Sequence, residues 1–228
     1  MHILKTETKI YSFAELSPEA QQHAMEKASE AAGGFFGEDL SFEFDNYADA
    51  AALLGWNIRT RFVKLLGGGT RRAPAIYFSG FWSQGDGACC EGVWRAADCD
   101  AAKLKAEFPT DKALHDIADS FARVADIYAN ASFSVKHRGP YYHSGCTDFD
   151  IESGIDRDSN SNCAGDKAVH AFHARDGAAD ALKAAARAFM DWIYSQLEAE
   201  YEYQTGEELA RETCEAAGEV FGEQGDRA

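Results

Sequence analysis

The spacing of hydrophobic and polar residues changes along the chain, and each spacing predicts an element. Side-chain character alternates residue by residue over 56–66, "WNIRTRFVKLL", which is the period of a β-strand. The segment that follows, "GGGTRRAP", is predicted to be a flexible turn. Further segments rich in aromatic and β-branched residues are predicted as strands at 2–13, 75–82, 88–94, 131–139 and 141–153.

Helical spacing is clearest at 176–204, where one face is apolar. That face carries Leu182, Ala186, Phe189, Ile193 and Leu197. Other helices are predicted at 16–34, 38–55, 98–108, 110–130 and 205–222. Gly33 is placed to end the first of them. Thr205 and Glu208 have the spacing of a capping box at the start of the last.

The order of these elements predicts the fold class. The strands come in a block and do not alternate with helices, which disfavours a doubly wound parallel sheet. We expect an α+β fold with an antiparallel sheet of about five or six strands, helices packed on one side, and a helical C-terminus. The chain has four prolines and no Pro-rich linker, so we predict a single domain over 1–228. Residues 205–228 would form its acidic C-terminal helix and tail.

Charge narrows the classes of partner. The 228 residues carry a formal charge of −16. Residues 198–228 contain ten acids against Arg211 and Arg227, which places half of that charge in one segment. A strong negative charge argues against direct nucleic-acid binding and against docking on anionic membranes. It fits either a solvated face or a surface presented to a basic partner.

The expected cellular compartment follows from segments that the sequence does not contain. No apolar run reaches the roughly 18 residues that cross a bilayer, and "MHILKTETKI" is too polar for a signal peptide. The six cysteines contain no CxxC pair. We therefore expect a cytoplasmic protein with free thiols.

The stretch "IYFSGFWSQGDGACCEGVW" at 76–94 poses the main chemical question. A phosphate-binding glycine loop joins a strand to a helix, whereas here a strand follows a strand. Gly85-Asp86-Gly87 suits a tight hairpin, because positive φ is cheap for Gly and tolerable for Asp. We favour the hairpin. The alternative is a binding loop in which Gln84 and Asp86 offer hydrogen bonds at an exposed tip beside Trp82.

A second cluster lies in "KHRGPYYHSGCTDFD". His137 and His143 could face each other across this hairpin, but strand alternation would place Cys146 on the face opposite His143. The spacing matches no standard zinc pattern, and a structural zinc site needs four ligands, so we expect no metal and no cofactor. Asp148 and Asp150 lie two apart and share a strand face, where they either face water, bind Mg²⁺, or act as acid and base.

Four segments of the sequence resemble a known family. They are "YSFAELSPEAQQHAMEKA", "IYFSGFWSQGDGACCEG", "VKHRGPYYHSGCTDFDIE" and "FMDWIYSQLEAEYEYQTGEEL". Together they are similar to small phage and prophage proteins of unsettled function that are often labelled antitoxins, and "FSGFWSQGDGA" is the most specific block. The resemblance spans roughly residues 10–215. It implies a phage or mobile-element setting and carries over no catalytic residue.

Charge and resemblance together favour a non-enzymatic function. We expect a phage or mobile-element protein that inhibits a host defence complex, in the manner of an anti-CRISPR, by binding through an acidic surface in the host cytosol. The partner would be a host defence protein or ribonucleoprotein subunit with a basic surface. The predicted binding residues are Trp82, Gln84, Asp86, Glu91, His137, Tyr141, His143, Glu198, Glu200, Tyr201, Glu202, Tyr203, Glu207 and Glu208.

Two other functions stay open. A hydrolase or nucleotide-processing enzyme would need Asp86, Glu91, His137, His143, Asp148 and Asp150 to converge in one pocket. An antitoxin role rests on the family label alone. The long alanine-rich helix would also suit a homodimer, although nothing in the sequence requires one.

Overall fold

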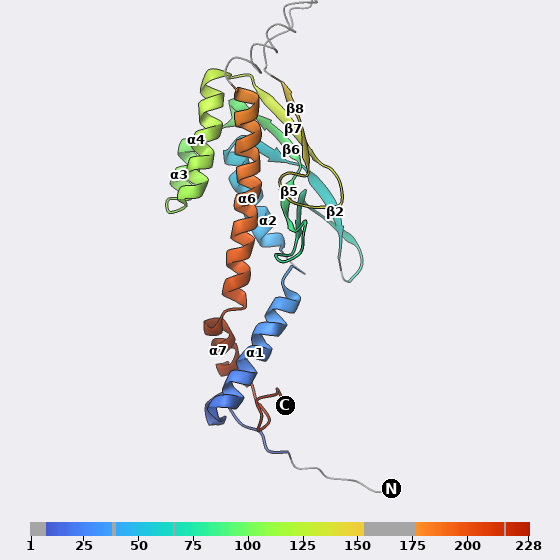
Figure 1. The fold of residues 1–228 in the computed structure, drawn as a ribbon, viewed down its shortest axis with the longest axis vertical. Coiled ribbons are helices and arrows are strands. Elements are labelled where there is room, and N and C mark those ends of the chain that lie inside the picture. The colour runs from blue at the N-terminus through green and yellow to red at the C-terminus, as the bar shows by residue number, and fades with distance from the viewer. Residues whose placement is uncertain (1–7, 38–39, 66, 153–176, 217) are drawn as a thin grey trace, which may run out of the picture. The chain divides into compact units, whose positions relative to one another are not determined.

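The computed structural model describes residues 8–37, 40–65, 67–152, 177–216 and 218–228 (Figure 1). Its contacts divide the chain into two compact units. We call residues 41–196 the sheet unit, and residues 1–40 with 197–228 the acidic unit. The long helix α6 (Ala178–Gln204) contributes to both. The single domain predicted from the sequence stays a prediction.

The sheet unit confirms the predicted α+β class, and its described residues form eight strands distributed over three antiparallel sheets. The main sheet has the order β1-β6-β7-β8. Its strands are β1 (Trp56–Ile58), β6 (Gly92–Arg95), β7 (Ser132–His137) and β8 (Thr147–Glu152). Two small sheets pair β2 (Thr60–Lys64) with β3 (Thr70–Pro74), and β4 (Ile76–Ser79) with β5 (Gly87–Cys90).

The strand predicted at 56–66 is two strands, because the chain changes sheet at Arg59. The Arg59 N–H donates to the carbonyl of Glu91 at 2.8 Å, and its own carbonyl accepts from the N–H of Ala75 at 2.6 Å. The chain then continues into the β2–β3 hairpin. The turn predicted at 67–74 is correspondingly shorter, since Thr70–Pro74 is a strand.

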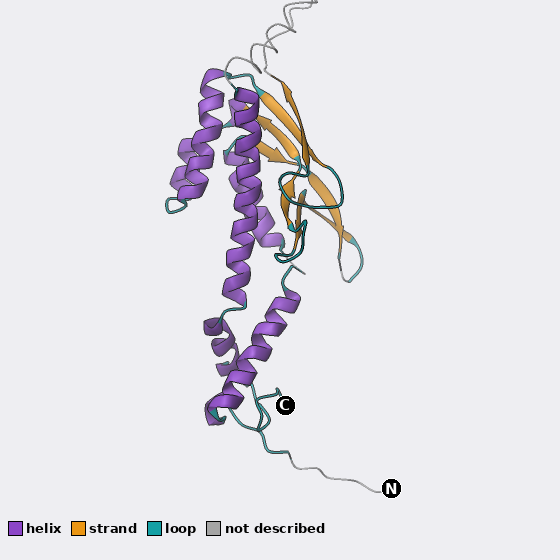
Figure 2. Ribbon diagram, viewed as in Figure 1, coloured by secondary structure: helices purple, strands orange, loops and turns teal. Residues whose placement is uncertain are grey.

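One face of the main sheet carries the core of the sheet unit. Trp56, Trp94 and Phe133 lie side by side on it, and all three are almost completely buried. Phe121 of α4 (Lys112–Ile127) and Phe189 of α6 pack against Trp56 at ring distances of 6.3 and 5.7 Å. The helices lie on one side of the strands, as predicted (Figures 1 and 2). Alternation turns the intervening polar residues of β7 and β8 to the other face.

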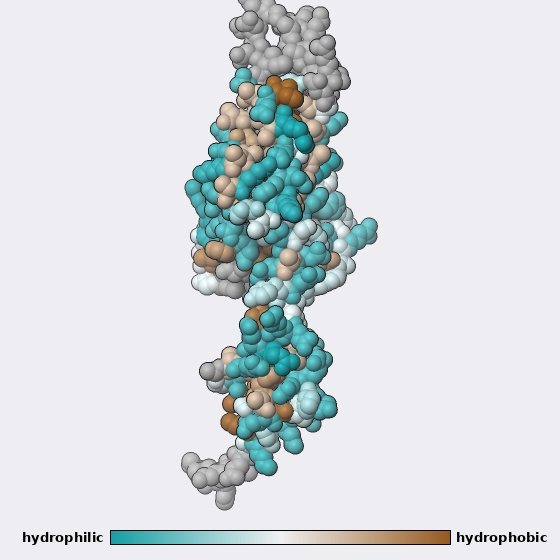
Figure 3. Space-filling view, turned by 90° about the vertical axis from the view of Figure 1, so that its left-hand side faces the viewer, coloured by the Kyte–Doolittle hydropathy of each residue, from teal (hydrophilic) through white to brown (hydrophobic). Residues whose placement is uncertain are grey.

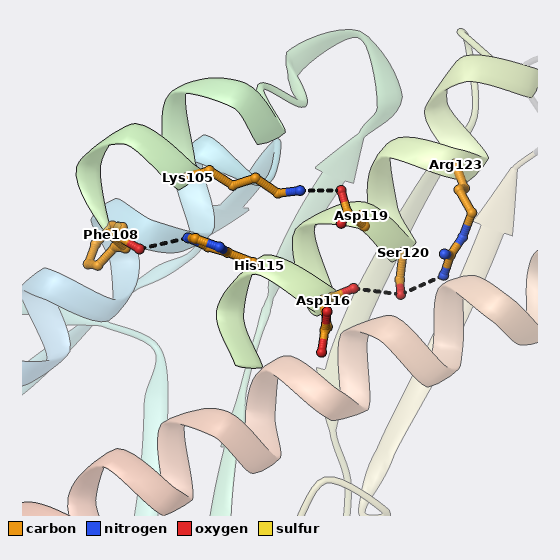
Figure 4. Close-up of polar contacts among 7 residues, drawn as sticks. All are labelled: Lys105, Phe108, His115, Asp116, Asp119, Ser120 and Arg123. Carbon is orange, nitrogen blue, oxygen red and sulfur yellow. Dashed lines mark hydrogen bonds and ion pairs between the residues drawn. The ribbon is translucent and has the colours of Figure 1, made fainter. Parts of the chain in front are cut away.

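The remaining helices of the sheet unit are α2 (Ser41–Leu53) and α3 (Ala101–Glu107), followed by α4. Asp100 and Asp111 cap α3 and α4 by accepting backbone N–H groups at 2.9 and 2.8 Å. The same Asp111 accepts from the Trp192 indole at 2.8 Å, which ties the start of α4 to α6. Between α3 and α4, Lys105 contacts Asp119 at 2.6 Å (Figure 4).

The acidic unit is built from both ends of the chain. Its helices are α1 (Pro18–Phe35), the end of α6, and α7 (Glu207–Glu215). Phe13, in the 3-10 turn η1 (Phe13–Glu15), packs on Phe221 with ring centroids 6.1 Å apart. The core of this unit comprises Phe13, Leu16, Ala20, Ala24, Met25, Ala210, Cys214 and Phe221.

Three boundary predictions in the acidic unit are wrong. Gly33 does not end α1, which continues to Phe35, and the glycine instead allows close approach, since a Cβ there would lie 3.0 Å from the Tyr201 hydroxyl. Thr205 does not cap α7: its hydroxyl donates to the Tyr201 carbonyl at 2.8 Å, and the N-cap is Gly206. Residues 8–13, the described part of the strand predicted at 2–13, contribute only an isolated bridge between Tyr11 and Phe221.

The described part of the chain contains no helix that could span a membrane. None of the helices there has the length and apolar composition needed to cross a bilayer.

Candidate functional site

The loop that contains Asp86 is held by the Asp86 carboxylate. The pairing of β4 with β5 confirms the predicted hairpin, although its connection runs from residue 80 to residue 86 and is no tight two-residue turn. One oxygen of Asp86 accepts the backbone N–H groups of Trp82 and Ser83 at 3.1 and 2.7 Å. Positive φ falls on Gly80 and Gly85 and not on Asp86. The backbone N–H groups that could otherwise bind an anion therefore donate to a carboxylate of the same loop.

The second predicted hairpin packs directly against this loop. A Cβ at Gly85 would collide with the Tyr141 ring, and one at Gly87 would lie 2.6 Å from the Cα of His143. Both glycines are thus required by close approach between the β4–β5 and β7–β8 connections. The two groups of candidate residues do meet, because Tyr141 and His143 border the loop that carries Gln84 and Asp86.

Glu91 and His137 form the link beneath these loops. A Glu91 carboxylate oxygen accepts the backbone N–H of His137 at 3.0 Å, and His137 Nε2 donates to the Tyr141 carbonyl at 2.9 Å. The His137 ring stacks on Tyr77 at 5.3 Å, and the Arg61 guanidinium lies 4.5 Å from the centroid of the same Tyr77 ring. Burial, followed by the charge of Glu91, raises the pKa of Tyr77.

Thiols near this cluster differ in exposure. Burial raises the pKa of Cys89 to about 12 and that of Cys90 far above its usual range, so both stay neutral. Cys146 is half-exposed, and its sulfur lies 3.4 Å from His143 Nε2. The prediction that these two residues lie on opposite faces is wrong, because they belong to a turn and not to β8. Within the described residues, no three His, Cys, Asp or Glu side chains are grouped to hold a metal.

Asp148 and Asp150 do not join the cluster. They lie opposite Lys136 and Ser134 in the β7–β8 register, whereas His137 lies opposite Thr147. Alternation therefore puts the two carboxylates on the exposed face of the sheet, away from the His137 ring. Asp148 contacts Arg138 at 3.5 Å, and both side chains are largely solvent-exposed. The six residues required by the hydrolase hypothesis are thus divided between two faces.

The C-terminal candidates all lie in the acidic unit. Tyr201 packs edge-on against Phe36 at 5.2 Å, whereas the neighbouring Tyr203 is 62% exposed. The glutamates are exposed except for Glu200, which is half-buried and accepts from the Gln204 amide at 2.8 Å. These glutamates are Glu198, Glu200, Glu202, Glu207 and Glu208. The described residues of the unit carry 14 acidic and four basic side chains, a net charge of −10.

An apolar groove of about 840 Å³ opens within this acidic unit. Alanines of α1, together with Phe35, Tyr203 and Leu209, line it. Glu200 and Asp226 lie at its charged margin, where the basic groups of Lys27 and Arg227 are each 3.0 Å from a glutamate. Figure 3 shows hydrophobic atoms gathered among hydrophilic ones on one face of this unit.

A second groove, of about 540 Å³, lies in the sheet unit between α4 and α6. Five alanines of α6 form one wall, and Ile117, Val124 and Ile127 of α4 lie on the other. This is the alanine-rich surface that the sequence offered for a homodimer. Dimerisation stays a prediction.

A family model described as a domain of unknown function (DUF8835) matches residues 40–207. The chain belongs to the DUF8835 family. The DUF8835 match includes the whole sheet unit and both hairpins, whereas α1 and nearly all of α7 lie outside it. No curated protein and no solved structure matches the chain.

One charged feature of this DUF8835 protein was missed from the sequence. Residues 56–85 contain five basic residues and no acidic one, which leaves the rest of the chain at −21. They are Arg59, Arg61, Lys64, Arg71 and Arg72, and the last four lie on β2 and β3. The net charge of the whole chain does not reveal this run of basic residues. A count of charge in windows along the sequence would have found it.

Proposed function

We propose that this DUF8835 protein is a non-enzymatic binding protein of phage or mobile-element origin that inhibits a host defence complex in the host cytosol. It attaches its acidic unit to a basic surface of a defence protein or ribonucleoprotein subunit. The observation that supports this most is the combination of a net charge of −10 with an open apolar groove in the same small helical unit. Charge guides the encounter, and the groove supplies desolvated contact area.

The groove favours one kind of partner segment. Phe35 and Tyr203 are 67% and 62% exposed at its margin, and aromatic side chains are the commonest anchors of protein interfaces. A groove lined by alanine and leucine accepts the apolar face of an amphipathic helix. Glu200, together with Asp226, whose carboxylate also contacts His23 at 3.1 Å, then pairs with lysines or arginines that flank that face. A basic amphipathic helix satisfies both requirements.

Catalysis has weaker support. The carboxylates and histidines that an active site would use are split between two sheet faces, and the Asp86 carboxylate is engaged with its own loop. The hydrolase alternative is supported by the Glu91–His137 contact, and the antitoxin alternative by the label of the similar phage proteins. Both remain predictions.

Two charge-neutralised variants test the proposal. Glu200→Gln/Glu207→Gln/Glu208→Gln removes three charges from the acidic unit, and Asp148→Asn/Asp150→Asn/Glu152→Gln removes three from the exposed face of β8. Binding to a panel of purified CRISPR effector complexes is measured by biolayer interferometry between about 50 and 200 mM salt. The same variants are expressed in cells whose CRISPR system targets a phage, and plaque counts report inhibition.

We expect the wild-type protein to bind at least one complex, with affinity falling steeply as salt rises. The acidic-unit variant should bind at least about tenfold more weakly and lose inhibition, because roughly 1.4 kcal/mol of pairing energy corresponds to that factor. The β8 variant should behave like the wild type. Absence of binding to every complex at low salt, or equal losses in both variants, would refute the proposal.

A further inference from the structure

The β2–β3 hairpin concentrates positive charge in an otherwise acidic chain. Its neighbourhood, residues 56–85, carries a charge of +5, against −21 for all other residues. Like charges at this density repel one another, and an anionic ligand would relieve that repulsion. Arg61 and Arg71 share one face of the hairpin, and both are half-buried. Arg61 packs on Tyr77 and donates to the Ile76 carbonyl at 3.0 Å.

The outward face of the hairpin follows from its register. Phe62 lies opposite Arg72, and Lys64 lies opposite Thr70, so these four side chains share one face. Phe62 is 70% exposed, so its ring is accessible to a ligand. The Arg72 guanidinium lies 5.6 Å from the centroid of its ring. The pair presents a flat aromatic surface next to two cations.

These cations are available for a ligand. In the described part of the chain, the exposed side chains of Arg59, Lys64 and Arg72 form no ion pair. On the α3–α4 hairpin of the same unit, by comparison, Lys105 forms an ion pair with Asp119, whereas Arg123 donates to the neutral Ser120 hydroxyl at 2.9 Å (Figure 4). Arg59, Lys64 and Arg72 therefore keep their charges available to an external anion.

We propose that the β2–β3 hairpin binds single-stranded nucleic acid. Arg59, Lys64 and Arg72 contact backbone phosphates, and the Phe62 ring stacks on a base. Cationic tracks combined with exposed aromatic rings are the features that hold single strands without sequence preference. Duplex DNA is a poorer fit, because its paired bases offer no free face to Phe62. The site lies in the sheet unit, and it does not depend on the function proposed for the acidic unit.

The test uses the full chain and a fluorescein-labelled thymidine or uridine oligonucleotide of about 16 nucleotides, the upper site size of a single binding module. Fluorescence anisotropy is measured from about 50 to 200 mM salt. Three phosphate contacts predict a slope of log K against log salt of about −2. Lys64→Gln/Arg72→Gln should weaken binding at least about tenfold at low salt and reduce the slope to about −0.7.

A matched control separates the hairpin from general charge. Lys103→Gln/Arg123→Gln removes two charges from the helices of the same unit and should leave binding unchanged. Phe62→Leu keeps an apolar side chain but loses the stacking surface, and should weaken binding about fivefold or more. Circular dichroism and thermal melting establish that each variant is folded. If the double variant unfolds, Arg59→Gln takes its place. This single variant should reduce the magnitude of the slope by about 0.7.

Several results would overturn the inference. One is the absence of binding at the lowest salt, and another is an equal loss in the control variant. A polyglutamate peptide that displaces the oligonucleotide as well as unlabelled oligonucleotide does, together with unchanged binding by Phe62→Leu, would indicate a site for acidic proteins instead.

Discussion

Trp56 and Trp94 provide a matched pair for testing how the core of the sheet unit is stabilised. They lie directly opposite each other in the β1–β6 register, and both are completely buried. The Trp94 indole N–H donates to the Leu54 carbonyl at 2.8 Å. The Trp56 indole N–H has no hydrogen-bond partner among the described residues. Gly92 leaves the space for it, since a Cβ there would lie 2.7 Å from Trp56 Nε1.

Substitution of each tryptophan by phenylalanine should therefore have unequal effects. Both changes remove the same ring atoms and leave similar cavities, so their packing costs nearly cancel in the comparison. Trp94→Phe also loses a hydrogen bond that contributes about 1 kcal/mol. Trp56→Phe removes a buried unpaired donor and recovers about 1–3 kcal/mol of desolvation. We expect Trp94→Phe to be less stable than Trp56→Phe by about 2–4 kcal/mol.

Urea denaturation followed by far-ultraviolet circular dichroism measures this difference. Equal slopes with denaturant would establish that both variants unfold over the same surface. Trp82→Phe is the exposed control, because Trp82 is 75% exposed, and its effect should stay within about 0.5 kcal/mol. The reasoning is refuted if Trp56→Phe lowers the free energy of unfolding as much as Trp94→Phe does.

Three further predictions concern the loops and thiols. Asp86→Ala removes the acceptor of two loop amides and should cost about 1 kcal/mol in urea denaturation; a neutral result would contradict the role of the carboxylate. Burial raises the pKa of Cys89 to about 12, whereas an unfolded thiol ionises near about 8.5. The neutral buried thiol therefore makes its full contribution to stability below about pH 8.5. That contribution falls by up to about 1.4 kcal/mol per pH unit as the pH rises towards 12. Cys89→Ala should flatten that decline in pH-dependent denaturation, and a thiol reagent at neutral pH should modify half-exposed Cys146 before Cys89. Gly225→Ala should destabilise the protein by more than about 1 kcal/mol relative to Gly218→Ala in thermal melting, since both have positive φ but only Gly225 faces the backbone of α1.

The fold class and the long helices were predictable because their signals are local. The stripe from Leu182 to Leu197 is completely buried or nearly so, as its helical spacing predicted. The division of strands among three sheets was not predictable, because it depends on Arg59 pairing with residues 16 and 32 positions away. Gly33 was misread for a similar reason: its constraint comes from Tyr201, far along the chain.

In the candidate site, too, local features were predictable from the sequence and long-range contacts were not. That a hairpin surrounds Asp86 followed from its glycines, and the pairing of β4 with β5 confirms it. The packing of Tyr141 against Gly85 joins two hairpins that are separate in sequence, and no local pattern encodes it. The basic run on β2 and β3 was visible in the sequence, but net charge was considered for the whole chain and for one terminal segment only.

The pairing of Tyr11 with Phe221 has a consequence for biosynthesis. The residues of the sheet unit are contiguous and can fold without the residues that follow them. The N-terminal helix has to wait, with Phe13, Leu16 and Met25 unburied, until the last thirty or so residues emerge. A released chain truncated after residue 196 should therefore present a protease-resistant middle and a cleavable beginning.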